Sequence, residues 1–425
     1  MHPIRFIHAA DLHLDAAFSG LSRDIPAEFA ERLRTATFTA FRRLLDLCER
    51  ESPDFLLLAG DVYNQEDASV SAQLALRDGF RRLESLSIPV FLVHGNHDPL
   101  ASRLRSVRWP GNVTVFGELP DAVPVFRKGE ETPLAIIHGA SHASGRETRN
   151  LAALFRRTEA CGLHVGLLHA TPGDADGVAR YAPFSQEDLK ASGMDYWALG
   201  HIHDRREVCR EPLAAYPGCT QGLHINEPGE KGCLLVTAEA RPDGGYAVRT
   251  SFRPLGPAVW KTLDMDLGGA ASLDELENRL RTGLDRAAAE VWSGCEMLLV
   301  RLRLQGRTEL DGLLRKGTTC AELADRLRED GSGVPRIWIK DIDVATRPCV
   351  ERGALLERED LLGEVFRLSE AARTASGLQA LREGPLAPLF AHARAGKALE
   401  PLTDEELARL LDDAESLCLD LLEND

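Results

Sequence analysis

The chain has no long hydrophobic run. Over its 425 residues, the longest purely apolar stretch in the first half is Phe55–Ala59, whereas a membrane-spanning helix needs roughly 20 consecutive apolar residues. The N-terminus reaches Asp11 without the apolar stretch of a secretory signal peptide. We therefore expect neither a membrane span nor a secretory leader.

Paired cysteines and an excess of positive charge are also missing. The nine cysteines are scattered and include no Cys-x-x-Cys pair, a pattern that favours a reduced cytoplasm over a disulfide framework. Lys and Arg number 50 against 66 Asp and Glu, a net charge of −16, so no overall positive field would attract nucleic acid or anionic lipid. Any DNA binding must therefore come from a local basic surface or from a partner.

Charge and histidine are distributed unevenly along the chain. Residues 351–425 hold 17 acidic and 8 basic side chains, a net of −9, which predicts that this acidic segment is a separate unit. Twelve of the 13 histidines lie at or before His224. Because histidine is both the usual base near neutral pH and the commonest metal ligand, the chemistry is expected in the first half.

Short apolar runs bounded by turn residues predict buried strands through the first half. Helical spacing between the first three runs predicts one helix from Pro26 to about Pro53 and a second over residues 68–86. This alternation predicts an α/β fold for residues 1–250. Beyond it we expect a small α+β domain at 255–347 and an acidic helical tail at 350–425. The predicted strands are 4–10, 55–59, 90–93, 134–137, 165–168 and 196–199.

Polar side chains follow the predicted strands at the point where each strand ends. In an open α/β sheet, ligands bind beyond the carboxyl ends of the strands, so residues placed there are the first functional candidates. Members of a pair two residues apart can face the same point, and the glycines would allow close approach of the backbone. The five clusters are Asp11-Leu12-His13, Gly60-Asp61, Gly95-Asn96-His97-Asp98, His169 and Gly200-His201-Ile202-His203.

Together these clusters offer nitrogen and oxygen donors without a cysteine. Such a donor set suits Mn, Fe, Zn or a similar divalent ion. Any one Asp-x-His or His-x-His pair alone is more often a structural hydrogen-bonding pair, but five clusters together favour a hydrolytic site with two metal ions. For His94, His138 and His142, which also lie near strand ends, a core or supporting hydrogen-bonding role is favoured.

The order of these motifs resembles that of the calcineurin-like metallophosphoesterase superfamily over residues 5–203. Within the superfamily the chain resembles the DNA repair exonuclease branch, nearest to its SbcD-like, YhaO-type group. The segments that carry this second resemblance are His8 to Asp15, Gly60 to Tyr63, and Tyr216 to His224 followed by Glu227 and Lys231-Gly232.

Two positions depart from the pattern of that branch. The chain has Cys219 where members usually have serine, and Asp15 where many have glycine. The resemblance implies a four-layer α/β core, a small α+β capping domain and a C-terminal helical segment.

The resemblance also implies a role for each candidate residue. One metal ion would be held by Asp11, His13, Asp61 and His203, and the other by Asp61, Asn96, His169 and His201, so that Asp61 bridges the two. Mn is the first choice of metal, with Fe, Zn or Mg as alternatives. His97 would act on the phosphoryl group or protonate the leaving oxygen, and Asp98 would orient its ring.

The resulting hypothesis is a divalent-metal phosphodiesterase that acts on DNA, an exonuclease and endonuclease subunit of a repair complex. Its implied partners are an SMC-like coiled-coil ATPase and a second copy of the chain, paired through helices near residues 68–86. The chain has no Gly-x-x-x-x-Gly-Lys-Ser/Thr loop, so ATP hydrolysis would be supplied in trans. Two alternatives stay open: a phosphoesterase of small or cyclic nucleotides, and a non-catalytic scaffold for DNA ends and an ATPase.

The acidic tail contains a clear helix signal. Thr403-Asp404-Glu405-Glu406 is a capping box. An apolar stripe at spacings of three and four follows it. This stripe predicts an amphipathic helix that packs either on its own domain or on the coiled-coil root of the ATPase. Its members are Leu407, Leu410, Leu411, Ala414, Leu417 and Leu421.

Overall fold

The computed structural model describes residues 2–21, 25–63, 69–101, 107–173, 180–242, 244–329, 333–349, 352–391 and 402–422. The chain divides into two compact units. The first comprises residues 1–267, 272–306 and 313–345, and the second comprises 268–271, 307–312 and 346–425. Within the described ranges, no helix combines the length and the apolar character that a bilayer crossing requires.

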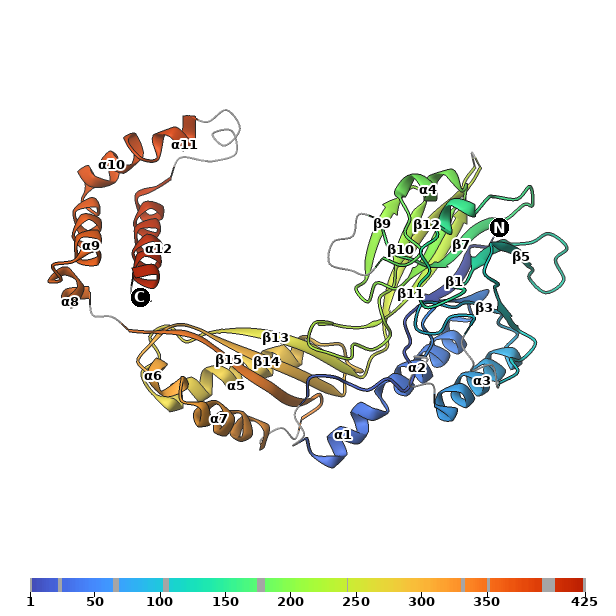
Figure 1. Ribbon diagram of the computed structural model, residues 1–425, viewed down its shortest axis with the longest axis horizontal. Helices are drawn as coiled ribbons and strands as arrows, with labels where there is room; N and C mark the ends of the chain where they lie inside the picture. Colours follow the sequence, from blue (N-terminus) through green and yellow to red (C-terminus); the bar gives the residue numbers. More distant parts are fainter. Residues whose placement is uncertain are drawn as a thin grey trace. The chain divides into compact units, whose positions relative to one another are not determined.

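The first unit contains two six-stranded sheets (Figure 1). The strands of the first sheet are, in spatial order, β12 (Tyr246–Pro254), β11 (Gly232–Ala240), β1 (Ile4–Ala9), β2 (Phe55–Ala59), β3 (Val90–Val93) and β4 (Val113–Val115). Those of the second are β5 (Asp121–Val125), β6 (Ala135–Ala140), β7 (Leu163–His169), β8 (Tyr196–Gly200), β10 (Leu213–Tyr216) and β9 (Arg206–Arg210). Strands β1 to β4 run parallel, as do β6, β7, β8 and β10.

The two sheets face each other across one buried core. Phe6 and Phe55 of the first sheet belong to the same apolar cluster as Val165 and Tyr196 of the second. The outer face of the first sheet packs on α2 (Ala36–Glu51) and α3 (Val70–Ser85), and that of the second on α4 (Gln186–Ala191) and the short 3-10 helix η1 (Ala152–Leu154). Because the central strands are covered on both faces, they are continuously apolar. The predicted four-layer α/β fold is confirmed.

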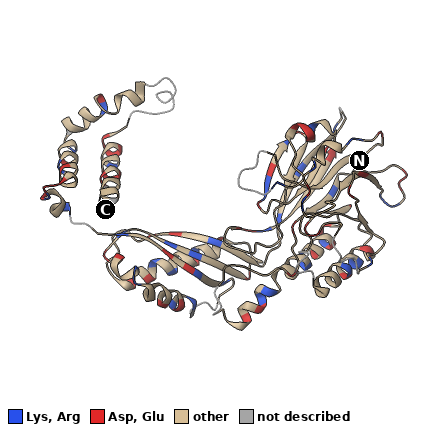
Figure 2. Cartoon of the chain, in the orientation of Figure 1, with Lys and Arg blue, Asp and Glu red and all other residues tan. Residues whose placement is uncertain are grey.

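A smaller three-stranded sheet follows the core, as the alternation in the sequence predicts. It has the order β13 (Ala258–Asp266), β14 (Met297–Thr308) and β15 (Arg336–Pro348). Leu302 is buried, whereas the neighbouring Arg301 pairs with Asp341 on β15 at 2.7 Å, and Figure 2 shows positive and negative residues interleaved along the sheet. The proposed domain limits at 250, 255 and 347 stay a prediction. The accompanying helices are α5 (Leu273–Glu290), α6 (Asp311–Leu314) and α7 (Gly317–Glu329), and α1 (Ala27–Arg34) precedes α2.

The second unit is mainly helical. It contains α8 (Arg352–Leu356), α9 (Leu361–Ala372), α10 (Ala375–Glu383), α11 (Ala387–Ala391) and α12 (Asp404–Leu422). The predicted capping box is present, since Thr403 Oγ1 accepts the Glu406 N–H at 3.2 Å and Glu406 accepts the Thr403 N–H at 2.7 Å. A small core joins α8, α9 and α12 through residues that include Phe366 and Leu419.

The apolar stripe of α12 is divided between two environments. Leu407 is buried within the unit, whereas Leu410, Leu417 and Leu421 are 45%, 59% and 66% exposed. Part of the stripe therefore packs on its own unit, and the described residues cover the three other leucines only in part.

Candidate metal centre

The loops that leave β1, β2 and β8 turn sharply where the strands end. Asp11, His13 and Asp61 have φ angles of 51°, 41° and 51°, and His201 has 107°. Asp and His enter this left-handed region more readily than most side chains, at a cost of about 1–3 kcal/mol that the surrounding structure must offset. Here the first two loops run side by side, with the His13 N–H donating to the Asp61 carbonyl at 3.1 Å. These turns direct the side chains toward a common region.

Asp11, His13 and His203 form the first donor cluster. One ligand atom of each lies within 4.8 Å of the others. The His13 and His203 Nε2 atoms are 3.2 Å apart, and His203 Nε2 is 3.8 Å from Asp11 Oδ1. Two imidazole nitrogens that converge beside a carboxylate form a suitable donor set for a divalent ion.

Asp61, His169 and His201 form the second donor cluster, under the same 4.8 Å criterion. His169 Nε2 lies 3.3 Å from Asp61 Oδ2 and 3.0 Å from Asn96 Oδ1. The ring centroids of His169 and His201 are 5.2 Å apart. Asn96, which the sequence predicts to act with these residues, therefore lies next to the second donor cluster.

Asp61 lies between the two clusters. Its Oδ2 atom is 3.3 Å from His169 Nε2 in one cluster and 4.0 Å from His13 Nε2 in the other. Its Oδ1 atom accepts the backbone N–H of His97 at 2.9 Å. Since the carboxylate is only 1% exposed, its charge faces both clusters rather than solvent.

Three glycines make this close packing possible. A Cβ atom on Gly60 would lie 2.5 Å from His169 Nδ1, and one on Gly95 would lie 2.3 Å from Asp61 Oδ1. On Gly200 it would lie 1.8 Å from the carbonyl oxygen of Ala59. The prediction that these glycines allow close backbone approach is confirmed, because any side chain there would displace a site residue or a strand.

Hydrogen bonds to Nδ1 orient the imidazole rings of His169 and His203. His169 Nδ1 lies 2.9 Å from the Ala59 carbonyl, so this nitrogen donates its proton and Nε2 is left as the ligand atom. His203 Nδ1 is similarly paired with Glu227, whose other oxygen accepts the Leu223 N–H at 2.7 Å. Burial opposes ionisation of Glu227, but the hydrogen bond and charge of His203 outweigh it and lower its pKa to about 2.

The orienting role of Glu227 was not predicted. The residue stands in a segment that carries the family resemblance, but spacing alone assigns it no partner, because its contact with His203 spans 24 residues of chain. Of the histidines predicted to have supporting roles, His142 has its Nε2 atom 2.6 Å from the His169 carbonyl. His138 instead pairs with His164 at 3.0 Å.

Asp98, which was predicted to orient the His97 ring, has backbone amides as its recorded hydrogen-bond partners. The Asp98 carboxylate accepts backbone N–H groups of Gly95, Asp61 and Val62 at 2.7, 3.3 and 3.0 Å, and lies 3.4 Å from His94 Nδ1. It is fully buried, whereas His97 is exposed and packs edge-on against the His13 ring at 5.2 Å. Asp98 therefore joins the loops after β2 and β3, because amide donors satisfy its charge.

The charges of the site suit cation binding. Burial raises the pKa of Asp11, because ionisation is costly there. Burial also opposes protonation of His169, but the neighbouring Asp61 and Asp11 carboxylates raise its pKa to about 9. In the protein alone, protons on imidazoles thus balance buried carboxylates. Since metal ions displace protons from such ligands, these nitrogen and oxygen donors fit two divalent cations.

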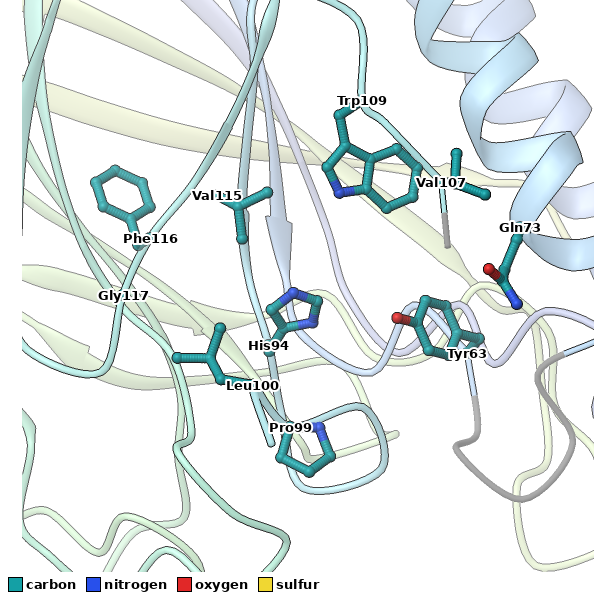
Figure 3. Close-up of a pocket in the computed structure, with 10 residues that line it drawn as sticks. All are labelled: Tyr63, Gln73, His94, Pro99, Leu100, Val107, Trp109, Val115, Phe116 and Gly117. Atoms are coloured by element: carbon teal, nitrogen blue, oxygen red, sulfur yellow. The ribbon is translucent and has the colours of Figure 1, made fainter. Parts of the chain in front are cut away.

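A cavity of about 440 Å³ borders the loop that carries Asn96 and His97. Figure 3 shows the His94 ring among the residues that line the cavity, with Val115 and Trp109 above it and Tyr63 to its right in this view. Leu100 and Pro99 line it where the loop ends. The loop that carries Asn96 and His97 therefore has an aromatic and apolar cavity beside it, lined by none of the residues of the two donor clusters.

Comparison with known proteins agrees with this geometry. Residues 4–205 match the family model of calcineurin-like phosphoesterases, and 260–347 match that of the middle domain of metallophosphoesterase YhaO. The uncharacterized metallophosphoesterase YhaO of Bacillus subtilis is 34% identical over 388 residues, which cover 90% of this chain and 91% of that protein. The DNA double-strand break repair protein Mre11 of Aeropyrum pernix is 26% identical over 315 residues, covering 68% and 69%. The chain thus belongs to the YhaO-type family of calcineurin-like metallophosphoesterases, which are metal-dependent phosphoester hydrolases.

Proposed function

We propose that this protein is a two-metal phosphodiesterase that acts on DNA, as the exonuclease and endonuclease subunit of a repair complex in the cytoplasm. The observation that carries the proposal is the position of Asp61, whose Oδ2 atom faces His169 at 3.3 Å and His13 at 4.0 Å. A carboxylate shared by two donor clusters can hold two cations at once. Similarity to a DNA double-strand break repair protein supports DNA as the substrate.

The proposed ligands follow the two donor clusters. Asp11, His13, Asp61 and His203 would hold one ion, and Asp61, Asn96, His169 and His201 the other. Bound Mn, or alternatively Fe, Zn or Mg, would supply a hydroxide nucleophile at neutral pH and stabilise the charge that develops on the phosphoryl oxygens.

The remaining chemistry belongs to the protein. His97 is exposed beside His13, so it can reach the leaving oxygen of a bound phosphodiester and donate a proton to it. Its backbone N–H is tied to Asp61, which keeps its ring beside the clusters. Glu227 and the Ala59 carbonyl bind Nδ1 of the His203 and His169 rings, which would leave Nε2 of each ring to hold an ion.

The proposed assembly pairs this chain with an SMC-like coiled-coil ATPase and with a second copy. Leu410, Leu417 and Leu421 of the acidic tail are exposed, which supports docking of the tail on an ATPase coiled coil. Val70 and Leu74 on α3 are 71% and 37% exposed, which supports pairing of two chains through this helix. The α+β domain at 255–347 would cap the catalytic domain at 1–250.

One substrate panel tests the proposal. Full-length protein is stripped of metal, reloaded with Mn, Mg, Zn or Fe, and incubated with linear duplex DNA, single-stranded DNA, cyclic nucleotides and a small phosphodiester. We expect metal-dependent cleavage of DNA that is faster than cleavage of cyclic nucleotides. Faster cleavage of cyclic nucleotides than of DNA would instead support a small-nucleotide phosphoesterase, and DNA binding without cleavage by any metal form would support a scaffold.

A further inference from the structure

Two adjacent arginines follow the last histidine of the metal centre, and no acidic side chain among the described residues pairs with them. Arg205 and Arg206 stand two and three residues after His203, and both are exposed. Within the described parts of the chain, neither guanidinium forms an ion pair, whereas Arg81 and Arg82 on α3 pair with Asp78 and Asp46. Even in a chain of net charge −16, the described acidic side chains thus leave these two neighbouring cations available to an anionic ligand.

Aromatic rings hold both side chains in place. The Arg205 Cζ atom lies 4.2 Å from the centre of the Phe252 ring, and the Arg206 Cζ atom lies 5.6 Å from that of Tyr216. Stacking on a ring restricts a guanidinium without using its N–H groups, so the planar fork remains available for an oxyanion. The two groups are thereby pre-oriented for a ligand.

The backbone of this segment is fixed to the loop after β10. The His203 carbonyl accepts the Cys219 N–H at 3.2 Å and a hydrogen bond from Lys231 Nζ at 3.0 Å, and Lys231 also binds Asp204 at 2.9 Å. A Cβ atom on Gly218 would lie 3.1 Å from the backbone nitrogen of Arg205, so the two segments are in close contact. The arginines therefore keep a constant position relative to the metal ligand His203.

A cleft of about 280 Å³ opens beside the two guanidinium groups. It is lined by both arginines, by Glu207, and by Tyr216 and Phe252, the rings on which they stack. Two arginines and one glutamate leave one net positive charge, which matches the single negative charge of a phosphodiester. Arginine forks suit phosphate oxygens because they donate two parallel hydrogen bonds.

We propose that Arg205 and Arg206 bind a non-scissile phosphate of the DNA backbone, next to the phosphate at the metal centre. This inference rests on the proposed function and deepens it, because it explains how an acidic protein holds DNA at its active site. Backbone phosphate contacts fix the register of a nucleic acid without reading its sequence. The subsite therefore acts on affinity and register rather than on the chemical step.

A substrate ladder tests the subsite. The full-length, Mn-loaded protein is compared on bis-p-nitrophenyl phosphate and a dinucleotide, which carry one phosphodiester, and on a trinucleotide and longer single strands, which carry a neighbour. We expect the wild-type KM to fall when the second phosphate is present, and Arg205→Ala with Arg206→Ala to remove that gain. Removal of each arginine should raise KM about 10-fold and leave kcat unchanged, because this is the scale of a hydrogen bond to a charged group.

Three further measurements separate this role from a structural one. Loss of one phosphate contact should reduce the slope of log KM against log salt by about one. Arg205→Lys should recover part of the loss, since it keeps the charge but not the fork. Arg210→Ala is the matched control, because Arg210 is an exposed arginine at the opposite end of β9, and it should leave every KM unchanged.

Two results overturn the inference. Equal losses on one-phosphate and two-phosphate substrates would show that the arginines act at the metal centre itself, and an unchanged KM on all substrates would show that they bind no phosphate. If wild-type protein cleaves small diesters but no oligonucleotide, the proposed DNA substrate is wrong, and this subsite is rejected with it.

Discussion

The metal centre and the helical tail give their buried polar side chains different kinds of partner. At the centre, buried polar groups have fixed backbone partners: Asp98 accepts three amide N–H groups, and His169 Nδ1 lies 2.9 Å from the Ala59 carbonyl. In the tail, the buried Glu415 pairs with side chains instead, Arg352 at 2.8 Å and Arg373 at 3.2 Å, and other pairs lie at the surface, such as that of Arg373 with Asp412, which is 62% exposed. Exposed pairs of this kind are worth about 0–1 kcal/mol. We therefore expect a substitution at the centre to leave a buried partner unsatisfied, and a substitution of an exposed residue in the tail to leave the fold intact.

Replacing Asp61 is the most severe test of the centre. Asp61→Asn removes the charge that both donor clusters face, so phosphodiesterase activity should fall to background. One preorganised electrostatic group is commonly worth about 10²–10³-fold, and this one serves two clusters, so a larger loss is expected. Activity on DNA and on a small diester is measured with metal content and thermal unfolding.

Asp15→Asn is the matched control for Asp61→Asn. Asp15 also has a positive φ, 68°, which asparagine tolerates, but it belongs to neither donor cluster. Its replacement should leave activity within about twofold of the wild-type value, because Asp15 is assigned no part in metal binding or catalysis. Full activity of a folded Asp61→Asn protein at saturating Mn would falsify the shared-carboxylate model.

His97→Ala separates chemistry from metal binding. The exposed ring lies beside His13 but in neither donor cluster, so both ions should remain bound while turnover falls. The expected loss is about 10²–10⁴-fold, the range for a general acid. Elemental analysis of the purified variant checks occupancy, and a missing metal would show that His97 is a ligand rather than a proton donor.

Much of the metal centre could be predicted from the sequence, because the end of a strand restricts where the side chains that follow it can lie. Parallel strands of one sheet finish at one edge, so Asp11 and Asp61, which follow the neighbouring strands β1 and β2, must lie near each other once the strands are recognised. His169 ends β7 in the second sheet, so its approach depends on how the two sheets pack, which the strand pattern alone does not give. The role of Asp98 could not be predicted, because a carboxylate beside a histidine in sequence can accept amides instead of the ring. Glu227 was missed because its partner His203 lies in another loop, and no periodicity relates the two.

Glu227→Gln should have a smaller and more selective effect than the two substitutions above. Glutamine keeps the size of the side chain but loses the charge that orients His203. Loss of such an orienting group costs about 10–100-fold in metal affinity or activity, and it should weaken only the ion held by His203. Calorimetric titration of metal-free protein with Mn measures both sites.

Glu239→Gln is the control for Glu227→Gln, because Glu239 is an exposed glutamate on β11. It should change neither affinity. Equal weakening of both metal sites by Glu227→Gln would mean that Glu227 supports the whole loop rather than His203 alone.

The tail shows where sequence periodicity stops being informative. The spacing of its leucines correctly predicts a helix and its capping box, since both are local features. It does not separate Leu407, which is buried, from Leu410, which is 45% exposed. A stripe at spacings of three and four is wider than the surface that one neighbouring helix covers, so which leucines pack depends on contacts between distant segments.

The least disruptive prediction concerns those exposed leucines. Leu417 and Leu421 are 59% and 66% exposed, so replacing both with glutamate in the full chain should change the free energy of unfolding by less than about 0.5 kcal/mol per site and leave phosphodiesterase activity unchanged. Capture of the SMC-like ATPase should be lost. Leu419→Ala is the contrasting variant: Leu419 is 3% exposed in the core with α9, and its truncation should cost about 2–5 kcal/mol, seen as faster hydrogen exchange across residues 352–422. Unchanged ATPase capture by the double variant would show that the exposed face of α12 is not the docking surface.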